Sequence, residues 1–134
     1  MPACSPQLLD ARAPTSPADL ASLPLLSLET RPEACDQWFA RHQVSVSGYS
    51  GMMLDQFSTA TQAAVAGLGV ALLPEIFIRR ELDDGDLVIA MDLPTRNEAA
   101  YYLVWPQERS DYAPLVALRE WLGQNNRARR AEIA

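Results

Sequence analysis

The sequence predicts an α/β fold in which a sheet is covered by helices. Segments with the apolar spacing of helices alternate with short strand-like segments, and no internal repeat is present. The run Val70–Leu73 is apolar on both faces and is bounded by Gly69 and Pro74, as expected for a strand with helices on both sides. The length of 134 residues fits one domain of ordinary size.

The first elements follow from proline spacing and from a capping pattern. Prolines recur too closely in residues 1–24 for a long helix, so an extended entry segment is expected there. Ser16, Pro17 and Asp19 form the pattern of a helix N-terminus, which predicts one short helical turn. A strand is predicted at Leu25 to Glu29.

Periodicity predicts the next two elements. An amphipathic helix is expected to start near Pro32, because four residues recur at i, i+3, i+4 and i+7: Cys35, Trp38, Phe39 and His42. Residues Val44 to Ser50 then alternate between apolar and small polar side chains, which predicts a half-buried strand.

A longer helix is predicted from about Asp55 to Ala66. Its expected buried stripe consists of Phe57, Ala60, Thr61, Ala64, Val65 and Leu68. Gly67 is placed to end this helix in a left-handed conformation. After the strand at 70–73, Pro74 can open a helix over Glu75 to Leu82.

The C-terminal part is predicted to contain two strands and a helix. The strands are expected at Leu87 to Met91, after an acidic turn, and at Tyr101 to Trp105. The last helix is expected to begin near Pro114, with Leu115, Leu118 and Leu122 on one face.

Charge and composition narrow the function classes. All 11 basic residues are Arg, so lysine-based Schiff-base chemistry and a P-loop are excluded. The net charge of −6 disfavours nonspecific nucleic-acid binding, and Arg127, Arg129 and Arg130 are interpreted as a solvated terminus. No membrane helix or secretory signal is recognisable, so a cytoplasmic protein without membrane contact is expected.

No catalytic residue, metal ligand set or cofactor motif is predicted. Cys35 and His42 share a helix face but lie ~10 Å apart along it, too far to bind one zinc ion. The stretch 48–52 lacks the last glycine of a nucleophile elbow, because that position is Met52. The turn at 83–86 lacks the spacing of a calcium loop.

A helix N-terminus rich in small hydroxyl residues is the remaining candidate site. Its residues are Ser50, Gly51, Phe57, Ser58 and Thr59. Free N–H groups and the positive end of the helix dipole favour an anion there, and Phe57 offers cover for an apolar part of a ligand. Plain capping, with Phe57 anchored in the core, is the alternative.

Several segments, in order along the chain, resemble the C-terminal effector-binding half of LysR-type transcriptional regulators, and the glycine-cleavage-activator branch is the most similar. The most characteristic segment is 57–74, F-S-T-A-T-Q-A-A-V-A-G-L-G-V-A-L-L-P. The other segments are 4–6, 16–20, 38–39, 81–88, 100–106 and 118–122.

The resemblance implies one lobe of a periplasmic-binding-protein-like (type 2) effector domain, with a mixed sheet flanked by helices. The expected parts are a crossing segment at 1–24, effector-binding lobe two at 25–98, a return strand and C-terminal helix at 99–125, and a flexible tail at 126–134. The helix-turn-helix and most of lobe one have no expected counterpart, so DNA binding is implied only through an N-terminal domain that this chain lacks.

The resemblance also gives the candidate anion site a context. It implies that Ser50, Gly51, Phe57, Ser58 and Thr59 line the cleft side of lobe two, where a small organic anion or an amino-acid-like effector would bind. It adds three hinge or cleft residues, Ser5, Pro6 and Tyr101. No cofactor and no catalytic activity are implied.

Without lobe one, the C-terminal helix would expose Leu115, Leu118, Trp121 and Leu122, which predicts a homo-oligomer formed through this helix. The leading hypothesis is therefore an effector-sensing, noncatalytic lobe. The alternative is a truncated dimerisation or interaction module without ligand binding. An enzyme is a third and weaker hypothesis, because no nucleophile is paired with a base.

Overall fold

The computed structural model describes residues 1–11, 13–46, 48, 50–95 and 102–132. The chain divides into two compact units, Met1–Arg96 and Asn97–Ala134. The second unit begins next to the boundary that the sequence places between residues 98 and 99.

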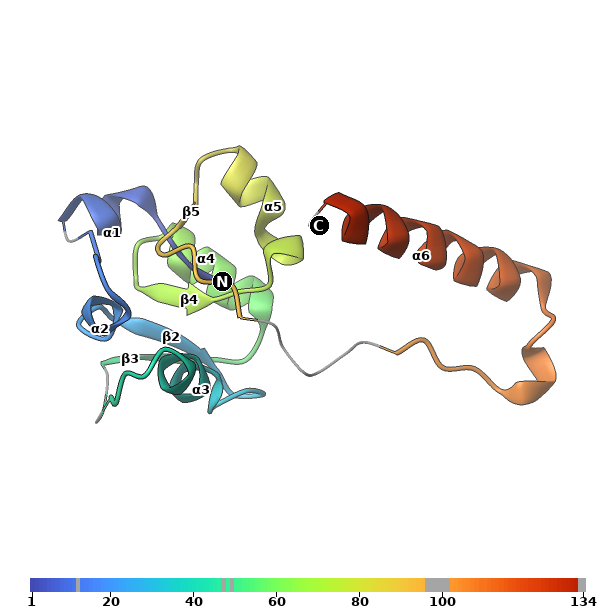
Figure 1. Cartoon of the computed structure of the whole chain (residues 1–134), viewed down its shortest axis with the longest axis horizontal. Helices are drawn as coiled ribbons and strands as arrows, with labels where there is room; N and C mark the ends of the chain where they lie inside the picture. Colours follow the sequence, from blue (N-terminus) through green and yellow to red (C-terminus); the bar gives the residue numbers. More distant parts are fainter. Residues whose placement is uncertain (12, 47, 49, 96–101, 133–134) are drawn as a thin grey trace. The chain divides into compact units, whose positions relative to one another are not determined.

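Unit 1 is built on a five-stranded sheet with the order β3-β2-β4-β1-β5 (Figure 1). Strand β2 is parallel to both β3 and β4, whereas β1 is antiparallel to β4 and β5. The predicted mixed sheet is therefore confirmed. The strands are β1 (Pro2–Cys4), β2 (Leu25–Leu28), β3 (Gly51–Leu54), β4 (Val70–Leu72) and β5 (Val88–Ile89).

Helices cover both faces of this sheet. They are α1 (Pro6–Ala11), α2 (Pro17–Leu20), α3 (Ala34–Arg41), α4 (Phe57–Val65) and α5 (Glu75–Asp83). Neighbouring residues of a strand point to opposite faces. Leu26 and Ala71 therefore join the core under α4 and α5, while Leu25 and Val70 join the core under α2 and α3.

Local sequence signals explain where several helices begin and end. The hydroxyl of Ser16 accepts a hydrogen bond from the Asp19 backbone, and the Asp19 side chain bonds back, so a capping box starts α2 as predicted. Gly67 follows α4 with φ 76°, the predicted left-handed position. Leu68 was predicted to belong to the buried stripe of this helix. That prediction is wrong, because Leu68 follows the end of the helix and its side chain is 51% exposed.

The prediction of a strand at Val44 to Ser50 is wrong, since no described residue of this segment is in a strand. The strand that pairs with β2 starts only at Gly51. Val44 and Val46 are partly buried against the core under α3, which explains their alternating pattern without a strand. Gln43 has a positive φ of 59° and turns the chain after α3.

The crossing segment 1–24 contains more structure than expected. Residues 2–4 form the strand β1, and the helix α1 follows directly, although an extended segment was predicted. The closely spaced prolines exclude a long helix but not α1, because Pro6 occupies its first helical position.

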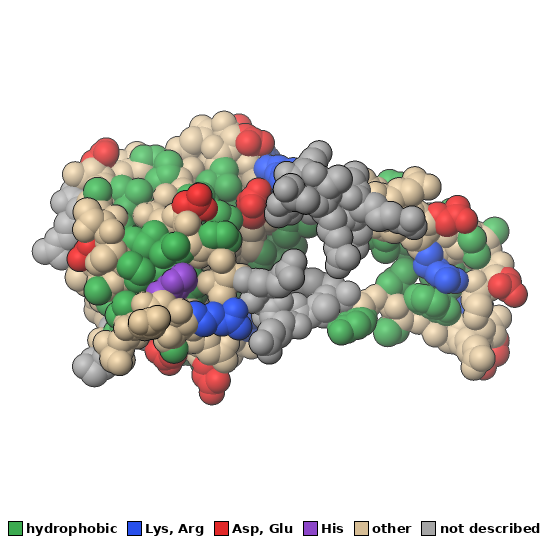
Figure 2. Space-filling view, in the orientation of Figure 1, with side chains coloured by type: hydrophobic (Ala, Val, Ile, Leu, Met, Phe, Trp, Pro, Cys, Tyr) green, Lys and Arg blue, Asp and Glu red, His purple; other side chains and the backbone are tan. Residues whose placement is uncertain are grey.

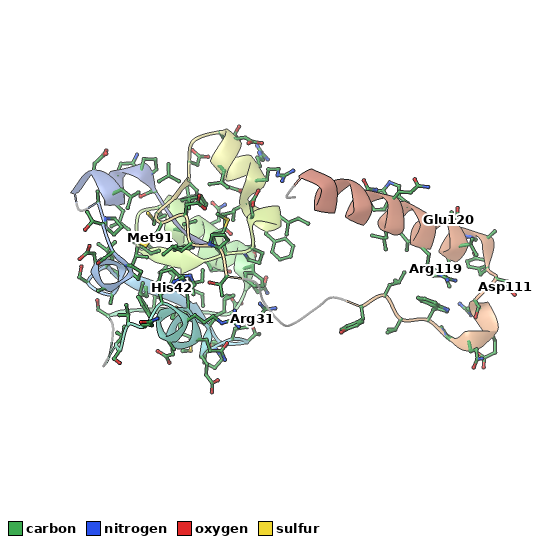
Figure 3. All side chains as sticks on the ribbon, in the orientation of Figure 1. Arg31, His42, Met91, Asp111, Arg119 and Glu120 are labelled. Atoms are coloured by element: carbon green, nitrogen blue, oxygen red, sulfur yellow. The ribbon has the colours of Figure 1, made fainter. Side chains whose placement is uncertain are left out.

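Unit 2 consists of an extended segment, a 3-10 turn at Gln107–Arg109 and the helix α6 (Ala113–Glu132). The Arg119 guanidinium lies 4.7 Å from the centre of the Trp105 ring and links α6 to the extended segment (Figure 3). The strand predicted at Tyr101 to Trp105 is not formed by its described residues, 102–105. The helix also runs to Glu132, through most of the predicted tail.

Two further observations concern the surface charges of unit 1 and the hydrophobicity of the helices. Acidic side chains are scattered over the face of unit 1 shown in Figure 2, with hydrophobic side chains between them. Across the described residues, no helix combines the length and the apolar character that a membrane span requires.

Candidate functional site

The parallel strands bring three connections to one edge of the sheet. Strands β2, β3 and β4 all end at this edge, which we call the carboxyl edge; the edge at which they begin is the amino edge. Helices α4 and α5 start at the carboxyl edge, directly after β3 and β4. In open α/β sheets, ligands bind outside the carboxyl ends of the strands.

Arg31, Phe57 and Phe77 meet at the carboxyl edge. The Arg31 guanidinium lies 5.5 Å from the centre of the Phe57 ring, and the Phe57 and Phe77 rings are 5.4 Å apart with a tilt of 48°. Arg31 is held by a tight turn after β2, in which its N–H donates to the Leu28 carbonyl at 2.9 Å (Figure 3). Arg31 comes from the connection after β2, Phe57 from the first position of α4 and Phe77 from the first turn of α5.

The starts of α4 and α5 at this edge have no side-chain cap. Gln56 at α4 and Pro74 at α5 make no capping hydrogen bond through their side chains. The Thr59 hydroxyl donates to the Asp55 carboxylate at 3.1 Å, and the Ser58 hydroxyl donates to the Gln56 side chain at 3.5 Å. In α5 the Phe77 N–H already donates to the Pro74 carbonyl at 3.0 Å. The N–H groups that remain available to an anion are therefore those that open α4, at the positive end of that helix.

The predicted site residues are divided between the two edges. Phe57, Ser58 and Thr59 open α4 at the carboxyl edge. Ser50 and Gly51 instead lie at the amino edge, where the Ser50 carbonyl accepts a hydrogen bond from Leu25 at 2.9 Å. The four residues of β3 separate the two groups by roughly 10 Å.

Ser5 and Pro6 also lie at the amino edge. They follow β1, which runs antiparallel to β4. The Ser5 N–H donates to the carbonyl of Ala64, near the end of α4, and its hydroxyl is buried without a partner among the described residues. Tyr101, the third predicted hinge or cleft residue, lies outside the described residues.

Residues 1–127 match the family described as LysR substrate binding domain. This chain belongs to that family. The resemblance inferred from the sequence motifs is therefore confirmed.

Two curated transcriptional regulators illustrate the relationship of this LysR substrate-binding domain to longer proteins. The HTH-type transcriptional regulator PerR of Escherichia coli is 32% identical over 123 residues, which is 90% of this chain and 41% of PerR. The glycine cleavage system transcriptional activator of the same species is 28% identical over 125 residues, 91% of this chain and 40% of the activator. The chain thus spans about two-fifths of their length. These relatives are regulators, not enzymes.

A solved structure confirms the fold class. The effector-binding domain of AmpR from Citrobacter freundii is 28% identical and superposes with a TM-score of 0.61, over 67% of this chain and 44% of that chain. The sheet and helices of unit 1 therefore form part of an effector domain with the periplasmic-binding-protein-like fold.

Arg31 and Phe77 were missed in the sequence of this LysR-type domain. Arg31 stands two residues after the predicted strand at 25–29, and Phe77 lies in the first turn of the helix that Pro74 precedes. Arg31 therefore lies in a strand-to-helix connection and Phe77 directly after one, the general position of ligand sites in α/β sheets. Neither residue carries a small hydroxyl, the property that marked the predicted site.

The two thiols of the LysR-type domain are buried and poorly reactive. Burial raises the pKa of Cys4 to about 11 and also raises the pKa of Cys35. Cys35 packs with its sulfur 3.5 Å from the Ser27 hydroxyl, and His42 packs against Trp38 with ring centres 4.4 Å apart. Within the described ranges, no three His, Cys, Asp or Glu residues are grouped as a metal site.

Proposed function

We propose that this chain is the effector-sensing lobe of a LysR-type transcription regulator, with a small organic anion or an amino-acid-like effector bound at the carboxyl edge. The observation that carries the proposal is the Arg31 guanidinium, placed 5.5 Å from the Phe57 ring beside the uncapped start of α4. A cation and free N–H groups recognise a carboxylate, while the ring contacts the rest of the ligand.

The effector would act by joining two lobes. A ligand held between lobe two and lobe one favours one relative orientation of the lobes, and subunit contacts pass this change to the DNA-binding domains of the complete regulator. In this proposal the lobe works in the cytoplasm and contacts DNA only through a domain outside this chain. No cofactor takes part.

The test is a backbone-amide NMR titration of the 134-residue chain with small organic anions and amino acids. Concentrations up to about 10 mM are needed, because half of a two-lobed site is expected to bind only in the millimolar range. We expect shifts at Arg31 and at the first turn of α4. Shifts confined to Ser5, Ser50 and Gly51 would move the site to the amino edge, and no shift with any compound would refute the proposal.

An interaction module is the second candidate, and the surface of α6 favours it. Leu118, Trp121 and Leu122 are exposed at i, i+3 and i+4 on this helix. A contiguous apolar stripe of this kind is typical of an interface, so self-association through α6 follows. This proposal does not require any bound ligand.

Light scattering over a concentration series tests the second candidate. We expect a dimer that dissociates in the Leu118→Asp and Trp121→Asp variants. Gln124→Asp places the same charge at an exposed polar position of α6 and should leave the dimer intact. A monomer at every concentration would eliminate this function and leave effector sensing as the only candidate.

A further inference from the structure

The charge of Arg31 has no anionic partner among the residues that the structure describes. Its guanidinium lies over the face of the Phe57 ring. The Glu75 carboxylate, at the start of α5, is bonded to Arg79 at 3.4 Å, and Asp55 accepts a hydrogen bond from the Thr59 hydroxyl. A partly buried guanidinium of this kind presents its N–H fork to a planar anion.

Apolar surface lies directly beside this charge. The Phe57 ring is half-buried against the core under α4, and Phe77, which is 45% exposed, extends the same surface. Two tilted aromatic rings favour another flat apolar group stacked or packed edge-on against them. The carboxyl edge therefore combines one cationic group with an aromatic wall.

The charges at this edge also limit the charge of the ligand. Asp55 and Glu75 follow β3 and β4, at the same edge as Arg31. Arg79 neutralises Glu75, so Asp55 is the carboxylate left beside the Arg31 charge. A monocarboxylate needs only the Arg31 guanidinium, whereas a dianion such as phosphate brings a second negative charge to the edge that also holds Asp55.

We propose that the ligand is a monocarboxylate with an aromatic body. Its carboxylate bonds to the Arg31 fork and to the N–H groups that open α4, and its ring packs against Phe57 and Phe77. This inference rests on the proposed function, because it names the ligand class of the same site.

Phenylacetate is the probe, and two analogues separate the parts of the site. Phenylacetamide keeps the ring but removes the charge, and acetate keeps the charge but removes the ring. In an amide NMR titration of the full chain, we expect phenylacetate to shift Arg31, Phe57 and Phe77 and to bind at least about tenfold more tightly than either analogue.

Matched variants test whether Arg31 binds the carboxylate of the ligand. Arg31→Gln should weaken phenylacetate binding about tenfold, and Arg31→Lys should weaken it less, because lysine keeps the charge but loses the fork. Arg80→Gln removes the same charge from an exposed arginine near the other end of α5, paired with Asp84, and should change nothing. Amide spectra of the three variants confirm that each one is folded.

The outcomes distinguish the ligand class from the site. The class is wrong if phenylacetate shifts no amide of this edge at about 10 mM, or if Arg31→Gln and Arg80→Gln bind it equally. If an amino acid or another organic anion shifts Phe57 while phenylacetate does not, the ligand class fails and the proposed function stands. If no anion shifts this edge, both fail.

Discussion

The two edges of the sheet in unit 1 use small and polar residues for different purposes. At the amino edge, Gly51 and Gly69 let neighbouring backbones approach. A Cβ would lie 1.8 Å from a backbone carbonyl oxygen at Gly51 and 2.5 Å from one at Gly69. At the carboxyl edge, Arg31 projects from the connection after β2 and Phe77 from the first turn of α5. Small residues can therefore mark close packing as readily as a ligand site.

The largest effect is expected at the amino edge. Gly51→Ala places a Cβ 1.8 Å from the Leu25 carbonyl oxygen, so the pairing of β2 with β3 must break or shift. We expect the free energy of unfolding to fall by at least about 3 kcal/mol in urea titrations.

Ser50→Ala is the control for this variant. Ser50 contributes only its backbone carbonyl to the contact with Leu25, so its unfolding free energy should stay within about 0.5 kcal/mol of the parent chain. A Gly51→Ala variant as stable as Ser50→Ala would show that the amino edge is not closely packed.

An intermediate effect is expected on raising the pH. Burial raises the pKa of Cys4, at the amino edge, from 9.0 to about 11, so the folded chain holds the thiol proton more tightly than the unfolded chain. The stability from this group is complete below about pH 9 and is lost as the pH rises through about 11. By pH 11 the loss is about 2 kcal/mol.

Urea titrations between pH 8 and 11 measure this loss, and Cys4→Ala supplies the comparison. Without the thiol, the decline in unfolding free energy over this range should be smaller than in the parent chain. Equal declines would mean that the Cys4 site admits solvent and that the amino edge is open.

The smallest effect is expected at Ser5. Its side chain is buried, with 1% exposure, and its hydroxyl has no partner among the described residues. Ser5→Ala removes an unpaired polar group, so the unfolding free energy should be unchanged or raised by up to about 1 kcal/mol.

Ser58→Ala, at the carboxyl edge, is the matched exposed substitution and should change stability by less than about 0.5 kcal/mol. Thermal melts of both variants compare the edges directly. A Ser5→Ala variant that is destabilised by more than about 1 kcal/mol would indicate that this hydroxyl is bonded in solution.

The elements with strong local signals were predictable from the sequence. The spacing of Cys35, Trp38 and Phe39 located α3, all three being buried, and the apolar run after Gly69 located the central strand β4. These predictions succeed because helix periodicity and burial on both faces are properties of a few neighbouring residues.

The strand β3 was not predictable in the same way. It forms because Gly51 can approach Leu25, while its next two residues, Met52 and Met53, are both exposed and give no alternation. Pairing between segments distant in sequence decided this element, and neither segment carries that information alone.

The candidate site was predictable only in part. The start of α4 could be placed from its own sequence. Ser50 and Gly51 are close to that start in sequence but not in space, since the length of β3 separates them. Arg31 reaches Phe57 because β2 and β3 are parallel neighbours, which is a feature of the sheet order. That order became visible only in the folded structure.

The position of β1 has a consequence for how the chain reaches its fold. This first strand lies between β4 and β5, with Ala3 opposite both Ala71 and Ile89. Contacts of such long sequence separation form slowly, because a large loop must close before they stabilise anything. During synthesis on a ribosome, the first residues therefore stay without strand partners until nearly the whole of unit 1 has emerged.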